Sequence, residues 1–415
     1  MICPGCSCLC DDIEIRDGKV LHACRRGARI YLNYKENRAE ARVDGKSVDV
    51  DSAIDAAVEA IKSSKSLAIY GLDTTVVEAQ ELAIKLAEKT QAYIDDNSSF
   101  CIGDFVELVL KKELPTATLD DVRDNAYVIF YWGTNPYHSL SRHMSRYTYY
   151  PRGGKRQRGY EEDRFLVVVD VRRTETGILA KKNARFIKID NDSEFIDSFF
   201  KVMDGKAAKY ANDIAAIIRE MKRADFNVIF GGLGLKYGLK GELGKFVELV
   251  KTLNDKIAPL YFIPAGFHAN MRGFNETLFE RVGAVNKFSF KDQKSDKSYE
   301  FSELLKNDAL DTALIIGTDP FNSLPFEISK KLKKIKTIVI DPKNSLTARV
   351  ADIVIPSAIS GIEQEGTMVR SDGVRFKLEA FDKKEIDDVY ILESCLLYTS
   401  PSPRDLSTSR MPSSA

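Results

Sequence analysis

Short apolar runs alternate with amphipathic segments along most of the chain. Between several of the runs, apolar residues recur at helical spacing, as at positions 76–88 and 243–253. Short apolar strands that alternate with helices favour parallel sheets covered on both faces. We therefore predict an α/β protein with doubly wound, Rossmann-like parallel sheets and strands at 67–70, 127–131, 165–170, 228–230, 260–263, 313–316, 337–340 and 353–355.

The pattern also contains an internal near-repeat. In each copy one strand ends in Gly-Thr-(Asn/Asp)-Pro, a second strand ends in Asp, and a third short strand follows; the first copy is lengthened by a basic, tyrosine-rich insert at 147–164. Two ordinary βαβ units are the plain interpretation. Both copies, however, place polar residues at strand C-terminal ends, where open α/β sheets bind ligands. The repeat predicts two nucleotide-like ligands, or one ligand with two halves, at Gly133, Thr134, Asn135, Gly317, Thr318 and Asp319.

Further candidates lie at the same strand ends. An acid there can accept from a ribose hydroxyl or a guanine edge, and an arginine can pair with a phosphate. Glycines after the strand at 228–230 would leave backbone amides free for a phosphate, although a tight turn needs glycine anyway. Taken singly, each polar residue could instead cap a helix or form a surface ion pair. The candidates are Asp170, Arg173, Thr174, Asp341, Gly231, Gly232, Gly234 and His138.

Length and charge narrow the class of protein. The chain has 415 residues, enough for two or three domains, and its 61 basic residues balance its 61 acidic ones. A balanced charge gives no broad basic field for nucleic acid or an anionic membrane. No apolar run approaches the roughly 20 residues needed to span a bilayer, and the N-terminus shows no signal pattern. We expect a cytoplasmic, reducing location.

Five of the seven cysteines fall within the first 24 residues. In a reducing compartment, clustered cysteines are more often metal ligands than disulfides. The spacing Cys3-x2-Cys6-x3-Cys10-x13-Cys24 lacks the second C-x2-C pair of a zinc site, so it favours an iron–sulfur cluster over structural zinc. Cys8 is interpreted as a non-ligand.

Cys101 stands just before a predicted helix that starts near Asp104. The helix dipole would favour its thiolate, and the residue could then bind a metal. The alternative is an ordinary buried cysteine. At the other end, the helical pattern stops after Glu393, and a Ser-, Pro- and Thr-rich stretch follows. We expect residues 396–415 to be non-native sequence and exclude them from the predicted fold.

Several segments together resemble a known family. In order they are CPGCSCLCDDIEI, HACRRGA, FCIGD, YWGTNPYHSLSRHMSR, VVVDVRRTET, IPAGFHANMRGFNE, IGTDP and ADIVIPSAISGIEQEGTMVRSDG. They resemble the B subunit of formylmethanofuran dehydrogenases, relatives of molybdopterin-dependent formate dehydrogenases, up to about residue 390. The resemblance implies a [4Fe-4S] cluster on the four spaced cysteines and a bis-(molybdopterin guanine dinucleotide) cofactor with tungsten or molybdenum, ligated by Cys101. It adds Gly366 and Thr367 to the cofactor site and His268 to the catalytic residues.

The resemblance also implies a reaction and partners. CO2 would be reduced reversibly to formate, which an amidohydrolase-like subunit would condense with methanofuran. The other expected partners in the complex are a β-helix-type subunit, ferredoxin-type subunits, and a small β-barrel subunit that completes the pterin site. Within the chain we expect an N-terminal iron–sulfur domain at 1–50, one α/β cofactor domain at 51–96 plus 208–390, and a second one inserted at 97–207.

Two positions depart from the family pattern. Ile102 stands where the family has histidine after its metal-binding cysteine, and Gly266 stands where it has arginine. Loss of one oxyanion stabiliser typically costs about 10²–10³ in rate. Arg272, six residues downstream, is a candidate substitute. The departures keep two alternatives open: a degenerate, non-redox scaffold subunit of a formyltransferase/hydrolase-type complex, and a molybdopterin oxidoreductase for another oxo-substrate.

Overall fold

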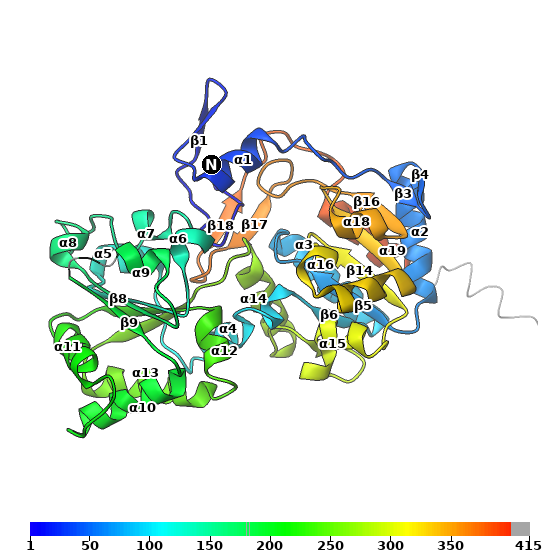
Figure 1. The fold of residues 1–415 in the computed structure, drawn as a ribbon. Coiled ribbons are helices and arrows are strands. Elements are labelled where there is room, and N and C mark those ends of the chain that lie inside the picture. Colours follow the sequence, from blue (N-terminus) through cyan, green and yellow to red (C-terminus); the bar gives the residue numbers. More distant parts are fainter. Residues whose placement is uncertain (180, 182, 400–415) are drawn as a thin grey trace, which may run out of the picture.

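The computed structural model describes residues 1–179, 181 and 183–399, and arranges them as two α/β lobes (Figure 1). All eight predicted strands form, within one or two residues of their expected bounds. Most of the segment expected to be non-native, residues 400–415, lies outside the described residues. Among the described residues, no helix combines the length and apolar character that a membrane span requires.

The first lobe is built on a five-stranded parallel sheet of order β11-β10-β7-β8-β9. The expected division at residue 207 assigned β10 and β11 to the other lobe, but both strands pair with this sheet. Helices α10 (Asp192–Met203), α11 (Ala211–Met221) and α13 (Leu243–Lys256) lie together on one side of the lobe (Figure 1). The strands are β7 (Val128–Trp132), β8 (Phe165–Asp170), β9 (Ala184–Lys188), β10 (Asn227–Gly231) and β11 (Leu260–Pro264).

The second lobe contains a nine-stranded mixed sheet of order β13-β12-β6-β5-β14-β15-β16-β3-β4. Its five central strands are parallel, and four of them were predicted, whereas β6 was not; the short pairs at both edges run antiparallel. The fold is therefore α/β with one parallel and one mixed sheet. The strands are β3 (Arg42–Val43), β4 (Lys46–Ser47), β5 (Leu67–Gly71), β6 (Tyr93–Asp95), β12 (Phe288–Ser289), β13 (Lys294–Ser295), β14 (Thr312–Ile316), β15 (Lys336–Asp341) and β16 (Ile353–Pro356).

Helices α2 (Val50–Ser63), α3 (Val77–Thr90) and α19 (Asp388–Tyr398) pack together over this sheet. The expectation that helix ends after Glu393 is wrong, because α19 continues to Tyr398. Its residue Cys395 is fully buried in the lobe's core, and the carbonyl of Leu396 accepts a hydrogen bond from Lys89 Nζ at 2.8 Å. An apolar face and a tertiary contact hold this turn in spite of the change in composition.

The near-repeat in the sequence corresponds to a repeated local structure. Gly133 and Gly317 both have φ +60°, and their amides donate at 2.9 Å to the carbonyls of Val169 and Ile340, respectively. The third residue of each motif then accepts from a threonine hydroxyl: Asn135 from Thr176 at 2.7 Å, and Asp319 from Thr347 at 2.6 Å. The motif thus supplies a tight turn and a bond to the start of the helix that follows the second strand, α9 (Glu175–Leu179) or α18 (Leu346–Val350).

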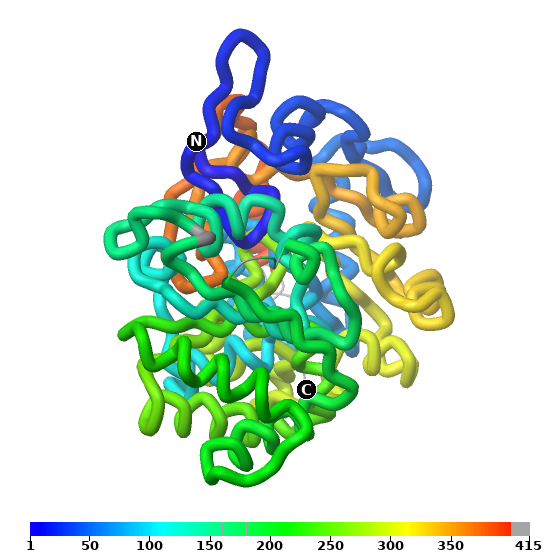
Figure 2. The backbone as a smooth tube through the Cα atoms, turned by 60° about the vertical axis from the view of Figure 1, so that its left-hand side comes forward, coloured from blue at the N-terminus to red at the C-terminus, as the bar shows by residue number. Residues whose placement is uncertain are grey.

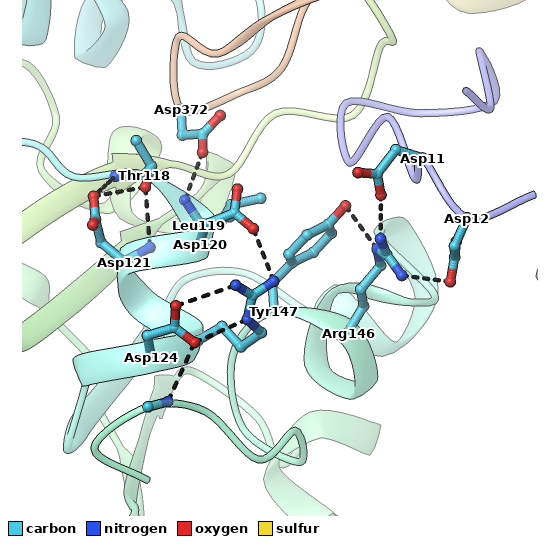
Figure 3. A network of polar contacts seen from close by, with 12 residues as sticks. Asp11, Asp12, Thr118, Leu119, Asp120, Asp121, Asp124, Arg146, Tyr147 and Asp372 are labelled. Carbon is cyan, nitrogen blue, oxygen red and sulfur yellow. Dashed lines mark hydrogen bonds and ion pairs between the residues drawn. The ribbon is translucent and has the colours of Figure 1, made fainter. Parts of the chain in front are cut away.

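The N-terminal segment lies across both lobes, beside the hairpin of β17 (Gly366–Val369) and β18 (Arg375–Leu378) (Figures 1 and 2). It contains a hairpin of its own, β1 (Glu14–Arg16) with β2 (Lys19–Leu21), and helix α1 (Arg25–Leu32). Arg146 lies between Asp11 and Asp12 and also donates to the Tyr147 hydroxyl (Figure 3). This network anchors the cysteine-bearing loop to the first lobe.

The basic insert at 147–164 contributes to that anchoring. The Tyr147 hydroxyl donates to the Cys8 carbonyl at 3.3 Å. Arg164 is fully buried, and its guanidinium donates to the carbonyls of Val122 and Ala126, at 3.1 and 2.9 Å. These residues of the insert therefore stabilise the fold.

Candidate functional site

Four of the N-terminal cysteines face one small enclosed cavity. Cys3, Cys6, Cys10 and Cys24 all line it, together with Arg142. Cys8, the fifth cysteine, is buried but does not line this cavity. The structure therefore brings together the four residues that the spacing selected.

Backbone geometry explains how the loop closes on itself. The Cys3 amide donates to the Cys10 carbonyl at 2.8 Å, and Leu9 adopts a left-handed conformation with φ +39°. Gly27, in the first turn of α1, packs directly on the sulfurs: its amide donates to Cys24 Sγ at 3.4 Å, and a Cβ on it would lie 3.0 Å from Cys3 Sγ. A side chain at position 27 would enter the space of the cysteines.

The donor set, four cysteines around one cavity, is one that a [4Fe-4S] cluster or a zinc ion can use. Within residues 1–179, 181 and 183–399, no three His, Cys, Asp or Glu side chains converge tightly enough for one metal ion. A zinc site needs four ligands about 2.0–2.3 Å from one centre, whereas the thiolates of a [4Fe-4S] cluster bind different irons. Burial raises the pKa of Cys3 and of Cys10 to about 12, so these thiols stay protonated unless a cation binds them.

A larger cavity of about 700 Å³ lies between α1 and the C-terminal edge of the nine-stranded sheet. Arg25, Arg26 and Arg29 line it from α1, and Lys343 lines it from the loop after β15. Thr74 and Gly317 line it from the ends of β5 and β14. This concentration of cations at a strand edge fits an anionic, phosphate-bearing ligand.

At the edge of the five-stranded sheet, the predicted ligand-binding glycines contact one another. A Cβ on Gly133 would lie 2.1 Å from the Leu235 amide nitrogen, and a Cβ on Gly232 would lie 2.5 Å from Thr134 Cβ. The Gly234 amide already donates to the Gly133 carbonyl at 2.8 Å. Close backbone packing between neighbouring turns is therefore sufficient to explain these glycines.

Most other predicted cofactor residues form contacts within the protein. The His138 imidazole lies 3.2 Å from a Glu175 oxygen, and the Thr367 hydroxyl donates to Glu78 at 2.8 Å. Asp170 and Asp341 each accept from a backbone amide two residues later. Their roles in binding a cofactor remain predictions, as do those of Arg173, Thr174, Gly231, Thr318, Asp319 and Gly366.

Cys101 lies in a short turn between η1 (Asn97–Ser99) and α4 (Gly103–Leu110), where the two lobes meet. The glycine-rich segment holds this turn, because Lys236 Nζ donates to the Ser99 carbonyl at 2.9 Å and the Tyr237 hydroxyl to the Phe100 carbonyl at 3.1 Å. Burial raises the pKa of the Cys101 thiol to about 11, outweighing the effect of Lys236. The expectation that the helix terminus favours its thiolate is thus wrong for the bare side chain.

The two residues that depart from the family pattern pack against each other. A Cβ on Gly266 would lie 2.7 Å from Ile102 Cδ1 and 3.1 Å from Ile102 Cγ1. The isoleucine therefore fills the space into which a side chain at position 266 would extend. The expected substitute has another partner: Arg272 donates from Nε to Glu276, one turn later in α14 (Met271–Val282), at 2.7 Å.

His268 forms an ion pair that the sequence did not predict. Its Nδ1 lies 2.6 Å from Oδ2 of Asp73, which is fully buried in the loop after β5. The same carboxylate oxygen accepts from Asn97 Nδ2 at 2.7 Å. Although burial lowers the pKa of His268, the Asp73 carboxylate raises it above the ordinary 6.5. In the sequence, Asp73 is an ordinary turn residue after a predicted strand. Only the fold brings it next to His268.

The cysteine loop contacts the loop that carries Gly266 and His268. The Ser7 hydroxyl donates to the Gly266 carbonyl at 2.6 Å, and the Ser7 amide donates to the Phe267 carbonyl at 3.0 Å. The guanidinium of Arg26 lies over the Phe267 ring, 4.2 Å from its centroid. Arg26 lines both the four-cysteine cavity and the arginine-lined cavity, and Gly266 packs against Ile102, the neighbour of Cys101.

Sequence comparisons give matches along almost the entire chain. A family model described as molybdopterin oxidoreductase matches residues 51–381. The B subunit of tungsten-containing formylmethanofuran dehydrogenase 2 from Methanocaldococcus jannaschii is 33% identical over 408 residues, covering 91% of this chain and 92% of that protein. The protein of the same name from Methanococcus maripaludis is 30% identical over 407 residues, with coverage of 91% and 92%.

Two solved structures share the fold. A chain of the formyltransferase/hydrolase complex FhcABCD from Methylorubrum extorquens, in complex with methylofuran, superposes with a TM-score of 0.69 at 20% identity, covering 89% of this chain and 99% of that chain. Acetylene hydratase from Pelobacter acetylenicus gives a TM-score of 0.55 at 11% identity, with coverage of 96% and 68%. At these identities the likeness concerns the fold.

Proposed function

Because this chain belongs to the molybdopterin oxidoreductase family and is a homologue of the B subunit of formylmethanofuran dehydrogenase, we propose that it is the redox subunit of such an enzyme and interconverts CO2 and formate. The observation that carries the proposal is the placement of four cysteines around one cavity, joined through Ser7 to the loop beside Cys101. This arrangement suits a short electron path between a cluster and a catalytic metal.

The residues present fit the two implied cofactors. Cys3, Cys6, Cys10 and Cys24 would hold a [4Fe-4S] cluster. The arginine-lined cavity would hold phosphates of a molybdopterin guanine dinucleotide, with Cys101 as ligand of tungsten or molybdenum. When bound, these groups supply the electron-transfer chemistry.

The side chains around Cys101 have separate tasks in this proposal. Ile102, 3% exposed, excludes water on one side of Cys101. Lys236, which follows β10 of the first lobe, fixes the turn and places a positive charge near the sulfur. His268 has a partly exposed side chain, so it can exchange a proton with solvent and supply it to the reaction.

The partners in the proposal follow from the same homology. Formate would pass to an amidohydrolase-like subunit, and the same complex would contain a β-helix-type subunit, ferredoxin-type subunits and a small β-barrel subunit. The arginine-lined cavity opens at the strand edge, where a partner chain could cover a bound cofactor.

The decisive experiment is elemental analysis of tungsten, molybdenum and iron in chain purified without oxygen and co-expressed with the small β-barrel subunit. We expect about one tungsten or molybdenum atom per chain, as one bound cofactor requires. Replacement of Cys101 by Ser tests the ligand and should lower that content while leaving iron in place. Iron without tungsten or molybdenum in the parent chain would refute the redox proposal.

A second candidate function is a scaffold subunit that has kept the fold and lost redox chemistry. The contact between Ile102 and Gly266 favours it, because both polar groups of the family pattern are absent and their space is filled. The intact set of four cysteines favours the redox function. Formate oxidation with an artificial dye discriminates between them: turnover by the metal-loaded complex would exclude the scaffold. Metal-loaded protein that turns over another oxo-substrate, but not formate, would instead support a molybdopterin oxidoreductase for that substrate.

A further inference from the structure

Asp73 is a fully buried carboxylate with an incomplete set of partners. Oδ2 binds His268 and Asn97, whereas Oδ1 has no hydrogen-bond partner among the residues that the structure describes. A buried carboxylate without full compensation is costly. The task of Asp73 is therefore sought in the side chain that it binds, His268.

His268, the partner of Asp73, lies between solvent and the region around Cys101. The loop after β11 brings His268 to Asp73, and the side chain of His268 is 31% exposed. Asn97, which shares the carboxylate oxygen, is fixed by the Tyr70 hydroxyl at 2.7 Å and lies four residues before Cys101. The pair therefore connects an accessible imidazole to the turn that carries Cys101.

His143 shows what a structural histidine looks like in the same chain. It is buried, its Nδ1 lies 3.2 Å from the Tyr131 hydroxyl, and its ring packs edge-on to Phe230. Burial lowers the pKa of His143 to about 3, so it stays neutral. His268 differs in both respects that matter for proton transfer: it has a carboxylate partner and a path to solvent.

Two charged groups, Asp73 and Arg26, act on the pKa of His268. Asp73 lies directly against Nδ1, and Arg26, which stacks on the neighbouring Phe267, opposes protonation. Behind Asp73, burial raises the pKa of Asp96 well above its usual range, with Asp73 and Asp95 adding to the effect. The raised pKa favours the protonated form of Asp96.

We propose that Asp73 is a positioning residue that binds Nδ1 of His268 and leaves Nε2 as the nitrogen that exchanges the proton of the reaction. The proposal rests on the proposed redox function. Reduction of CO2 to formate takes up two electrons and one proton and forms one C–H bond, and the cofactors that the cysteines would hold would supply the electrons. That proton leaves Nε2 of the imidazolium, and solvent then restores it. Asp73 acts through His268 and does not touch the substrate.

The first test follows the histidine itself by NMR titration of the full chain labelled with ring-¹³C histidine. The chain has only four histidines, so the signals can be assigned by single substitutions. We expect His268 to titrate above 6.5 in the parent chain and below 6.5 in Asp73→Asn, where burial is no longer offset. The matched control is Asp311→Asn, which removes a hydrogen-bonded carboxylate at the opposite edge of the same sheet and should leave His268 unchanged.

The second test measures dye-linked turnover against pH in the metal-loaded complex. His268→Gln should lower kcat by about 10²–10⁴, the usual contribution of a general acid or base. Asp73→Asn should lower kcat by less, with KM little changed, and should move the pH profile in the same direction as the NMR titration. Asp311→Asn should keep the parent profile.

The outcomes separate this proposal from the proposed function. An unchanged His268 titration in Asp73→Asn, or a shifted titration with unchanged kcat and pH profile, would overturn the positioning role. A parent complex that holds metal and turns over no formate would overturn the proposed reaction instead, and the NMR result would still decide whether Asp73 controls His268.

Discussion

The contact between Ile102 and Gly266 makes a quantitative prediction. A Cβ at position 266 would lie 2.7 Å from Ile102 Cδ1, well inside the roughly 3.5–4.0 Å optimum for two carbon atoms. Ile102 is 3% exposed and packs in the core of the first lobe, so a shift of its side chain would disturb neighbouring core residues. We expect Gly266→Ala to lower the free energy of unfolding by about 1–3 kcal/mol, the usual cost of overpacking.

A double-mutant cycle isolates this contact. Ile102→Val removes Cδ1 and should cost about 0.5–1.5 kcal/mol by itself. The double variant should be more stable than the sum predicts, with a coupling energy of at least about 0.5 kcal/mol, because the closest atom is gone. Gly244→Ala in α13 is the matched control: a Cβ there meets nothing within 4 Å, so its effect should be neutral or stabilising by up to about 1 kcal/mol.

The assay can use the single tryptophan of the chain. Trp132 is buried in β7 and belongs to the same core cluster as Ile102, so its fluorescence reports the unfolding of this lobe. Urea titrations under reducing conditions give the midpoint shifts and, with the slopes, the free-energy differences. Additive energies in the cycle, or a neutral Gly266→Ala, would show that the two side-chain positions do not compete for space.

Three further predictions concern the cysteine loop, the buried acids and the basic insert. Cys8→Ala should retain iron whereas Cys6→Ala should lose it, as measured by iron content after anaerobic purification, because only Cys6 lines the cavity. The raised pKa of Asp96 makes the folded parent chain bind more protons than the unfolded chain, so the stability of the parent falls as the pH rises from about 4, the ordinary carboxyl range. Asp96→Asn removes this loss and should therefore stabilise the chain increasingly as the pH rises. Urea midpoints at pH 5 and 8 check the difference. Arg164→Leu leaves buried carbonyls unpaired and should cost about 1–3 kcal/mol per orphaned group; undiminished stability in the same titration would contradict it.

The strands were predictable because long buried strands leave a clear apolar signal. The two-residue edge strands β3, β4, β12 and β13 are too short to show any period. The mixed character of the larger sheet was therefore not predictable. Apolar runs also do not reveal which sheet a strand joins. For this reason β10 and β11 were assigned to the wrong lobe, although their bounds were right.

The candidate site was predictable only where ligand spacing is local in sequence. Four cysteines within a short segment have to lie close together, and they do. Asp73 is far in sequence from His268, and only the meeting of two strand ends joins them. Arg272 shows the converse: closeness in sequence to Gly266 suggested a substitute, but the helix directs its guanidinium to Glu276.

The repeated turn explains why a motif alone did not locate the ligand site. Both copies fold in the same way, with a glycine at φ +60° and a capped helix after it. What differs is the loop that faces the glycine. Gly133 faces Gly234, and the two backbones fill the space between them. Gly317 instead faces Thr74, which donates its hydroxyl to the Gly317 carbonyl and lines the arginine-lined cavity. The motif therefore supplies a turn, and the capacity for a ligand comes from the neighbouring strand's loop together with the cations of α1.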